Sequence, residues 1–115
     1  IDANKGLKMF EKVNIPILGI IENMSLHICS KCQHEEAIFG SGGGESMAKD
    51  TKVNFLGALP LEIDIRTDVD EGTPTVVKSP ESRVAEIYKE IAMKVSAKLT
   101  QQEKAVSAFP SITIE

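Results

Sequence analysis

Cys29 and Cys32 are the residues of this chain best suited to chemistry, because only two residues separate the two thiols. That spacing lets both sulfurs point at one metal ion or cluster from a tight turn. It is also the spacing of a dithiol redox pair, but such a pair usually relies on a helix amino end to lower the thiol pKa, and no helix is predicted here. The third reading is two unrelated small hydrophobic side chains. We favour metal or cluster binding.

A thiolate site generally takes four ligands, and this chain supplies two cysteines. His27 and His34 flank the pair, so a Cys/His site within one chain is open, although a closed site usually draws its second pair of ligands from a separate segment. We expect both histidines to be solvated loop residues. Two copies of the chain, each giving Cys29 and Cys32 across a two-fold axis, would complete four thiolates. We therefore predict a homodimer with the ligand at its interface.

A second candidate site follows the apolar run Ile17–Ile21, which has no alternation. Such a run is typical of a strand buried on both faces in a parallel sheet. Asn23 lies just past its carboxyl end, where open α/β sheets place ligands. Its amide both donates and accepts hydrogen bonds, which matches the edge of a purine base. The alternative is an asparagine that turns the strand end by bonding its own backbone.

The remaining elements must position these residues. Helical spacing predicts a helix over residues 2–12, a short helix over 45–50 and a long helix that begins at Ser79–Glu81. Residues 53–59 indicate a second central strand, and 61–72 a loop with a short helix. Residues 26–39 predict a small hairpin or knuckle around the cysteines, and the glycines at 42–44 indicate a hinge more than an anion site. The core face of the long helix would carry Val84, Ile87, Tyr88, Ile91, Val95 and Leu99.

Size and charge exclude several classes of function. The chain has 115 residues, which is one modest domain, and a net charge of −4 without a basic stripe, so we expect no nucleic-acid partner. It contains no apolar run of about 18 residues, so we expect no membrane span. A close dithiol without a secretion signal favours a reducing cytoplasm.

The segment PILGIIENMS at 16–25, the Cys29/Cys32 pair, Ile38–Gly40 and the glycine run together resemble the Mrp/ApbC family of P-loop ATPases that carry iron–sulfur clusters. The resemblance continues through 55–61 and 70–74 and covers about residues 1 to 100. It implies an α/β fold, the carboxyl-terminal part of a three-layer parallel sheet of the P-loop NTPase type. It further implies that Cys29 and Cys32 hold a cluster, which we expect to be [4Fe–4S] and shared between subunits, for delivery to apo-proteins. It implies that Asn23 contacts adenine, with Pro60 and Leu61 as secondary candidates.

One departure from the family is the phosphate-binding loop, because the glycine run of this chain has no following Lys-Ser/Thr. We therefore expect the carboxyl-terminal part of a longer ATP-binding protein, one that would not hydrolyse ATP alone. Residues 1–100 would be the ATPase portion with a cysteine knuckle inserted at 26–40, and 101–115 a tail, either disordered or an edge strand. The alternative function is a zinc knuckle that holds a dimer, and a thiol–disulfide enzyme is a third.

Overall fold

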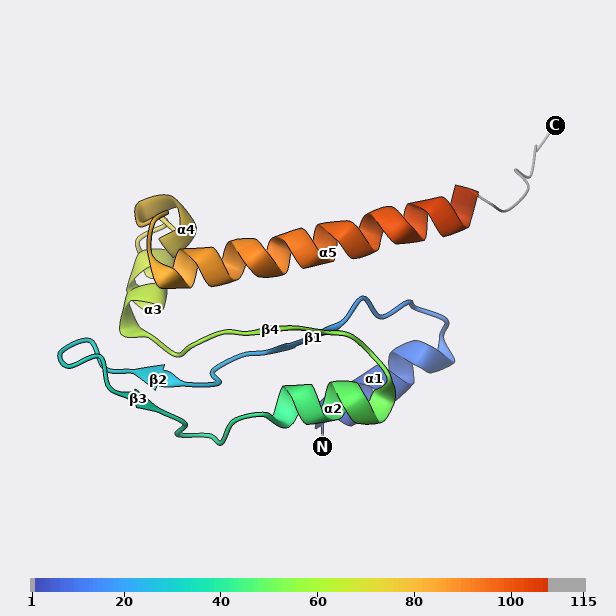
Figure 1. The fold of residues 1–115 in the computed structure, drawn as a ribbon, viewed down its shortest axis with the longest axis horizontal. Coiled ribbons are helices and arrows are strands. Elements are labelled where there is room, and N and C mark those ends of the chain that lie inside the picture. The colour runs from blue at the N-terminus through green and yellow to red at the C-terminus, as the bar shows by residue number, and fades with distance from the viewer. Residues whose placement is uncertain (1, 108–115) are drawn as a thin grey trace.

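The computed structural model describes residues 2–107, which form an α/β arrangement of helices and short strands (Figure 1). The elements in chain order are α1 (Asp2–Lys12), β1 (Ile20–Glu22), β2 (His27–Ile28), β3 (Glu35–Glu36), α2 (Gly43–Thr51), β4 (Phe55–Ala58), α3 (Ile63–Asp70), α4 (Thr75–Lys78) and α5 (Arg83–Ser107). The helices predicted at 2–12 and 45–50, and the strand predicted at 53–59, are confirmed by α1, α2 and β4.

The central sheet consists of β1 and β4, which pair in parallel with Ile20 opposite Phe55 and Glu22 opposite Ala58. Parallel neighbours need a crossover connection, and α2 supplies it. The two segments stay together beyond the strands, since the Leu59 amide donates to the Glu22 carbonyl (2.8 Å) and the Ser25 amide donates to the Leu59 carbonyl (3.0 Å). The chain after β1 is therefore held beside the chain after β4.

The expectation that residues 17–21 are buried on both faces is wrong for the described chain. Residues 17–20 are half-buried, and 42% of Ile21 is exposed. The helices explain this, because α2 packs on both β1 and β4, whereas α5 packs on β4. β1 therefore lacks the second cover that an apolar run without alternation predicts.

The core lies between β4 and α5, where buried Leu56, Leu59 and Ile91 form a cluster. Partly buried Ile87, Tyr88 and Val95 pack against it. The predicted apolar face of the long helix is thus confirmed over most of its length; its last member, Leu99, is 47% exposed.

The predicted bounds of the long helix need correction. It begins at Arg83 and not at Ser79–Glu81, because Ser82 is the residue that caps it: the Ser82 hydroxyl accepts from the Ala85 amide at 3.2 Å. It continues to Ser107, past residue 101, where we expected a tail to begin. Side-chain periodicity weakens there, but nothing in that stretch of sequence breaks a helix. The rest of the predicted tail, 108–115, lies outside the described residues, and with it the edge strand that was one of its two expected forms.

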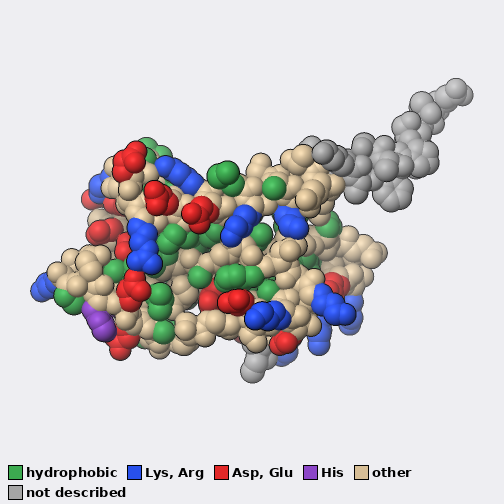
Figure 2. All heavy atoms as spheres, viewed as in Figure 1, with side chains coloured by type: hydrophobic (Ala, Val, Ile, Leu, Met, Phe, Trp, Pro, Cys, Tyr) green, Lys and Arg blue, Asp and Glu red, His purple; other side chains and the backbone are tan. Residues whose placement is uncertain are grey.

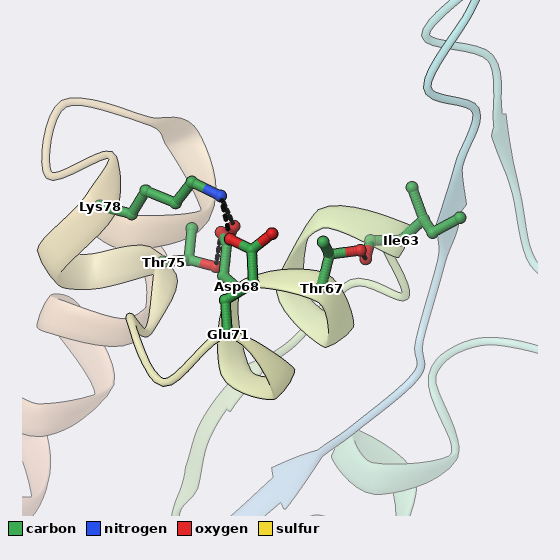
Figure 3. A network of polar contacts seen from close by, with 6 residues as sticks. All are labelled: Ile63, Thr67, Asp68, Glu71, Thr75 and Lys78. Atoms are coloured by element: carbon green, nitrogen blue, oxygen red, sulfur yellow. Dashed lines mark hydrogen bonds and ion pairs between the residues drawn. The ribbon is translucent and has the colours of Figure 1, made fainter.

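A buried carboxylate joins α3 to α4 (Figure 3). Asp68 accepts a hydrogen bond from the Thr75 hydroxyl at 2.7 Å and pairs with Lys78 Nζ at 2.8 Å, and Lys78 also reaches Glu71 at 2.9 Å. The Lys78 ammonium, followed by the Thr75 hydroxyl, holds the pKa of Asp68 below its usual range. The network ties α3 to α4, and four other residues of α3 line the cavity described below.

The surface carries mixed charge. On the face shown in Figure 2, acidic and basic side chains alternate, and hydrophobic side chains are visible where α5 meets the layer beneath it. Among the described residues, none of the helices combines the length and apolar character that crossing a bilayer requires.

Candidate functional site

The cysteine pair lies in the connection of an antiparallel hairpin. β2 pairs with β3, His27 opposite Glu36 and Ile28 opposite Glu35, and Cys29–Gln33 turn between them. The Cys29 amide donates to the His34 carbonyl at 3.0 Å, and the Gln33 amide donates back to the Cys29 carbonyl at 2.9 Å. Gln33 takes a left-handed backbone conformation, φ 59°, which closes the turn. The predicted hairpin at 26–39 is confirmed as a strand pair.

The turn presents both sulfurs to solvent and to each other. Cys29 is half-buried and Cys32 is exposed. The backbone amide of Cys32 lowers the pKa of the Cys29 thiol, with smaller contributions from the Lys31 amide and the Cys32 thiol. A thiolate is the form that binds metal and the form that attacks a disulfide, so this turn favours the reactive form of Cys29. The amides responsible belong to a turn and not to a helix end, so the lowered pKa does not need the helix on which the sequence argument against a redox pair relied.

The two histidines do not join the cysteines in a three-ligand group among the described side chains. Within residues 2–102, no three His, Cys, Asp or Glu side chains gather closely enough to hold a metal ion. His27 is half-buried on β2 and His34 is exposed. Cys29 and Cys32 are thus the two thiols that this turn brings together.

The three residues proposed for base binding lie around one cavity of about 310 Å³. Asn23 lies at the end of β1, and Pro60 and Leu61 follow β4, so the parallel pairing of the two strands brings them together. Buried Pro60 and half-buried Leu61 provide an apolar wall, and Asn23 is exposed at the rim. A partly apolar cavity with a few polar groups is the usual form of a small-molecule site.

The Asn23 side chain also makes the local contact considered as its structural alternative. Its Oδ1 accepts from the Met24 amide at 2.9 Å, and Met24 has φ 55°. That bond turns the chain at the strand end and orients the amide. The two hydrogens on Nδ2 are not used by this contact, so orientation and ligand binding are compatible.

Sequence reasoning missed the far wall of this cavity. Tyr88 of α5 and four residues of α3 also line it; those of α3 are Ile65, Arg66, Val69 and Asp70. Tyr88 was assigned only to the core face of its helix, which it also serves. A single tyrosine in a chain without tryptophan was the available signal, since an aromatic ring suits stacking on a base.

The glycine run leads into α2, and its amide end already has a partner. Gly42 is left-handed (φ 81°), and the Gly44 amide donates to Glu22 Oε1 at 3.4 Å. A carboxylate of the chain itself therefore lies where an anion would bind. This agrees with the interpretation of residues 42–44 as a turn.

Comparisons with known proteins point to one family. The family model described as ParA, NUBPL iron-transfer P-loop NTPase, matches residues 1–96. The iron-sulfur cluster carrier protein of Salmonella typhimurium is 53% identical over 106 residues, which are 92% of this chain and 29% of that protein. The iron-sulfur cluster transfer protein NUBPL of Mus musculus is 43% identical over 98 residues, 85% of this chain and 31% of that protein.

A solved structure is similar as well. The nucleotide-binding protein from Archaeoglobus fulgidus in complex with ADP aligns with a TM-score of 0.55 and 28% identity, over 70% of this chain and 32% of that one. The present chain thus spans less than a third of each of these proteins.

Proposed function

The chain belongs to the ParA family of NUBPL iron-transfer P-loop NTPases, and from that membership we propose that it is the cluster-binding and base-binding part of an iron–sulfur cluster carrier. The observation that carries the proposal is the pair Cys29 and Cys32 at the exposed turn of a hairpin. The cluster is cargo: it is taken up, held and passed to an apo-protein.

Two copies of the chain would hold one cluster. Each hairpin offers two thiolates, and a cluster with thiolate ligation takes four. We propose a homodimer in which both Cys29/Cys32 pairs ligate a shared [4Fe–4S] cluster. The lack of a three-ligand group among the side chains of residues 2–102 supports a site built from two copies.

Transfer needs a site that an acceptor can reach. Exposed Cys32 and half-buried Cys29 leave the sulfurs open to attack by thiolates of an apo-protein. Each incoming thiolate forms a bond to iron as a Cys29 or Cys32 thiolate leaves, so ligands are exchanged without a change in oxidation state. Paired thiols used in this way suit a reducing compartment, and we place the carrier in the cytoplasm.

Nucleotide would act in the longer protein. The cavity beside Asn23, Pro60 and Leu61 fits a base, and the similar Archaeoglobus protein is in complex with ADP. The glycine run of this chain does not have the Lys-Ser/Thr of a phosphate-binding loop. We propose that ATP hydrolysis belongs to the full-length protein, in which β1 and β4 join a larger three-layer sheet, and that residues 1–100 alone do not catalyse it.

Anaerobic reconstitution with iron and sulfide tests the cargo. We expect a brown chain with a broad absorbance near ~400 nm, because thiolate-ligated iron–sulfur clusters absorb there. Iron and sulfide analysis should give one cluster for every two chains. A colourless chain that retains zinc would contradict the carrier proposal and favour a zinc knuckle, and disulfide exchange without metal dependence would favour a thiol–disulfide enzyme.

Replacement of Asn23 by alanine tests the base site. Adenosine, followed by amide chemical shifts, should perturb residues around the cavity of the parent chain, and Asn23→Ala should weaken its binding by roughly three- to tenfold, the value of one hydrogen bond. Asn4→Ala on exposed α1 is the matched control and should bind as the parent does. Equal binding by Asn23→Ala and the parent would contradict the role of Asn23.

A further inference from the structure

Besides the buried side chain of Ile28, polar contacts of two kinds attach the cysteine hairpin to the body of the chain. The first is backbone pairing beside the segment after β4: the Leu61 amide donates to the Leu26 carbonyl and the Ile28 amide donates to the Leu61 carbonyl at 3.2 Å. The second is an ion pair, in which Arg83 Nη1 lies 2.7 Å from Glu35 Oε1. This pair joins β3 to the first residue of α5, 48 positions away in the sequence.

Arg83 occupies a position that a helix by itself disfavours. It is the first residue of α5, and the amino end of a helix carries partial positive charge, so a cation there is unfavourable. The hydroxyl cap from Ser82 is already in place and does not need it. A residue that is unfavourable within its own helix is expected to have a role in contacts with another part of the structure.

The residues around Arg83 indicate which segments it holds together. A cavity of about 250 Å³ lies between the hairpin and the start of α5, lined by Ser30 and Gln33 of the cysteine turn on one side and by Arg83 on the other. Glu62 lines this cavity and the base cavity alike. Burial, and then Asp64, raise the pKa of Glu62, while the Arg83 guanidinium opposes the rise. Arg83 thus faces the hairpin and the loop before α3 together.

We propose that Arg83 is a positioning residue for the cysteine hairpin: by pairing with Glu35 it sets the angle at which Cys29 and Cys32 leave the body of the chain. This inference rests on the proposed function for its consequence, because a second hairpin must meet the first in register to close four thiolates around one cluster. A pair exposed at both ends adds little to global stability. The Arg83–Glu35 pair instead affects the orientation of the hairpin relative to the body of the chain.

Charge reversal separates positioning from folding. In the metal-free chain, Arg83→Glu should speed hydrogen exchange of the Ile28 and Leu61 amides, which bond the hairpin to the segment after β4, by roughly three- to tenfold, since like charges then face each other across the pair. Exchange of the Ile20 amide, which bonds to the Asn54 carbonyl, should not change. The melting temperature should stay equal or rise, because an acid suits the first turn of α5.

The double variant Glu35→Arg/Arg83→Glu should restore slow exchange, because it restores opposite charges. Lys49→Glu is the control: it changes the net charge equally but reverses a pair within α2, where Lys49 lies 4.0 Å from Glu45. It should leave the hairpin amides as in the parent. On the reconstituted chain, loss of cluster to a chelator should quicken in Arg83→Glu and recover in the double variant.

The following outcomes would contradict the positioning role of Arg83. Unchanged exchange in Arg83→Glu, or no recovery in the double variant, would overturn the positioning role. If Arg83→Glu lowered the melting temperature and also sped exchange at Ile20, Arg83 would contribute to the stability of the whole fold. That result would also overturn the positioning role. Faster hairpin exchange without faster cluster loss would overturn its consequence for the site. If the parent chain takes up no cluster, the proposed function fails, and the metal-free exchange comparison still tests Arg83.

Discussion

The Cys29→Ser variant should fold as the parent chain does and should hold no stable iron–sulfur cluster. Cys29 is half-buried, and the turn around it is closed by backbone bonds with His34 and Gln33 that serine preserves. A serine hydroxyl is a poor ligand for the cluster because it is not ionised at neutral pH. After anaerobic reconstitution, bound iron per chain should fall by at least roughly tenfold, a loss at the scale seen when a metal site loses a partner.

The stoichiometry of this experiment tests the two-copy site. Each Cys29→Ser chain removes one ligand, so a homodimer of the variant loses two of four. His34→Ala is the matched control, since His34 is exposed beside the same turn and is not expected to ligate; it should load as the parent does. A full cluster load per dimer in Cys29→Ser would rule out the shared site, and loss of the cluster in His34→Ala would point to a Cys/His site instead.

The Gly19→Ala variant should be less stable than the parent by about 1–3 kcal/mol, the usual cost of forcing atoms into packed space. A Cβ at Gly19 would lie 2.5 Å from Leu56 Cγ and 2.8 Å from the carbonyl oxygen of Asn54. That carbonyl accepts the Ile20 amide at 2.8 Å, so the added carbon would press β1 away from β4. Urea denaturation followed by far-UV circular dichroism measures the change in the free energy of unfolding.

Gly6→Ala in α1 is the matched control: it adds the same methyl group but should raise the stability of the chain. A Cβ there would meet no heavy atom within 4 Å, and alanine favours a helix interior, so stability should rise by about 0.5–1 kcal/mol. Equal stability of Gly19→Ala and the parent would contradict the close approach of β1 and β4. Because that approach also brings Asn23 beside Pro60, the variant should weaken adenosine binding too.

Much of the local structure could be predicted from short stretches of sequence. Apolar spacing predicted α1, α2 and the core face of α5. The pattern of residues 26–39 predicted a hairpin, and the cysteine spacing indicated a tight turn. The prediction for residues 17–21 was wrong because it depended on distant parts of the chain. Residues 17–21 carry the composition of a doubly covered strand, yet what lies over each face is set by where α2 and α5 pack. The start of α5 depended on which of two nearby serines caps it, and Ser82 does.

By itself, the sequence determined the types of the elements, the pair of thiols and the family, because these depend on residues that are neighbours along the chain. Only the tertiary structure decided which groups meet. Asn23 shares a cavity with Pro60, Leu61 and Tyr88, and Glu35 reaches Arg83 across 48 positions. The physical reason is that parallel pairing of β1 with β4 and the packing of α5 on β4 are long-range interactions. Their register is set by hydrogen bonds and packing between distant segments, which no short stretch of sequence contains.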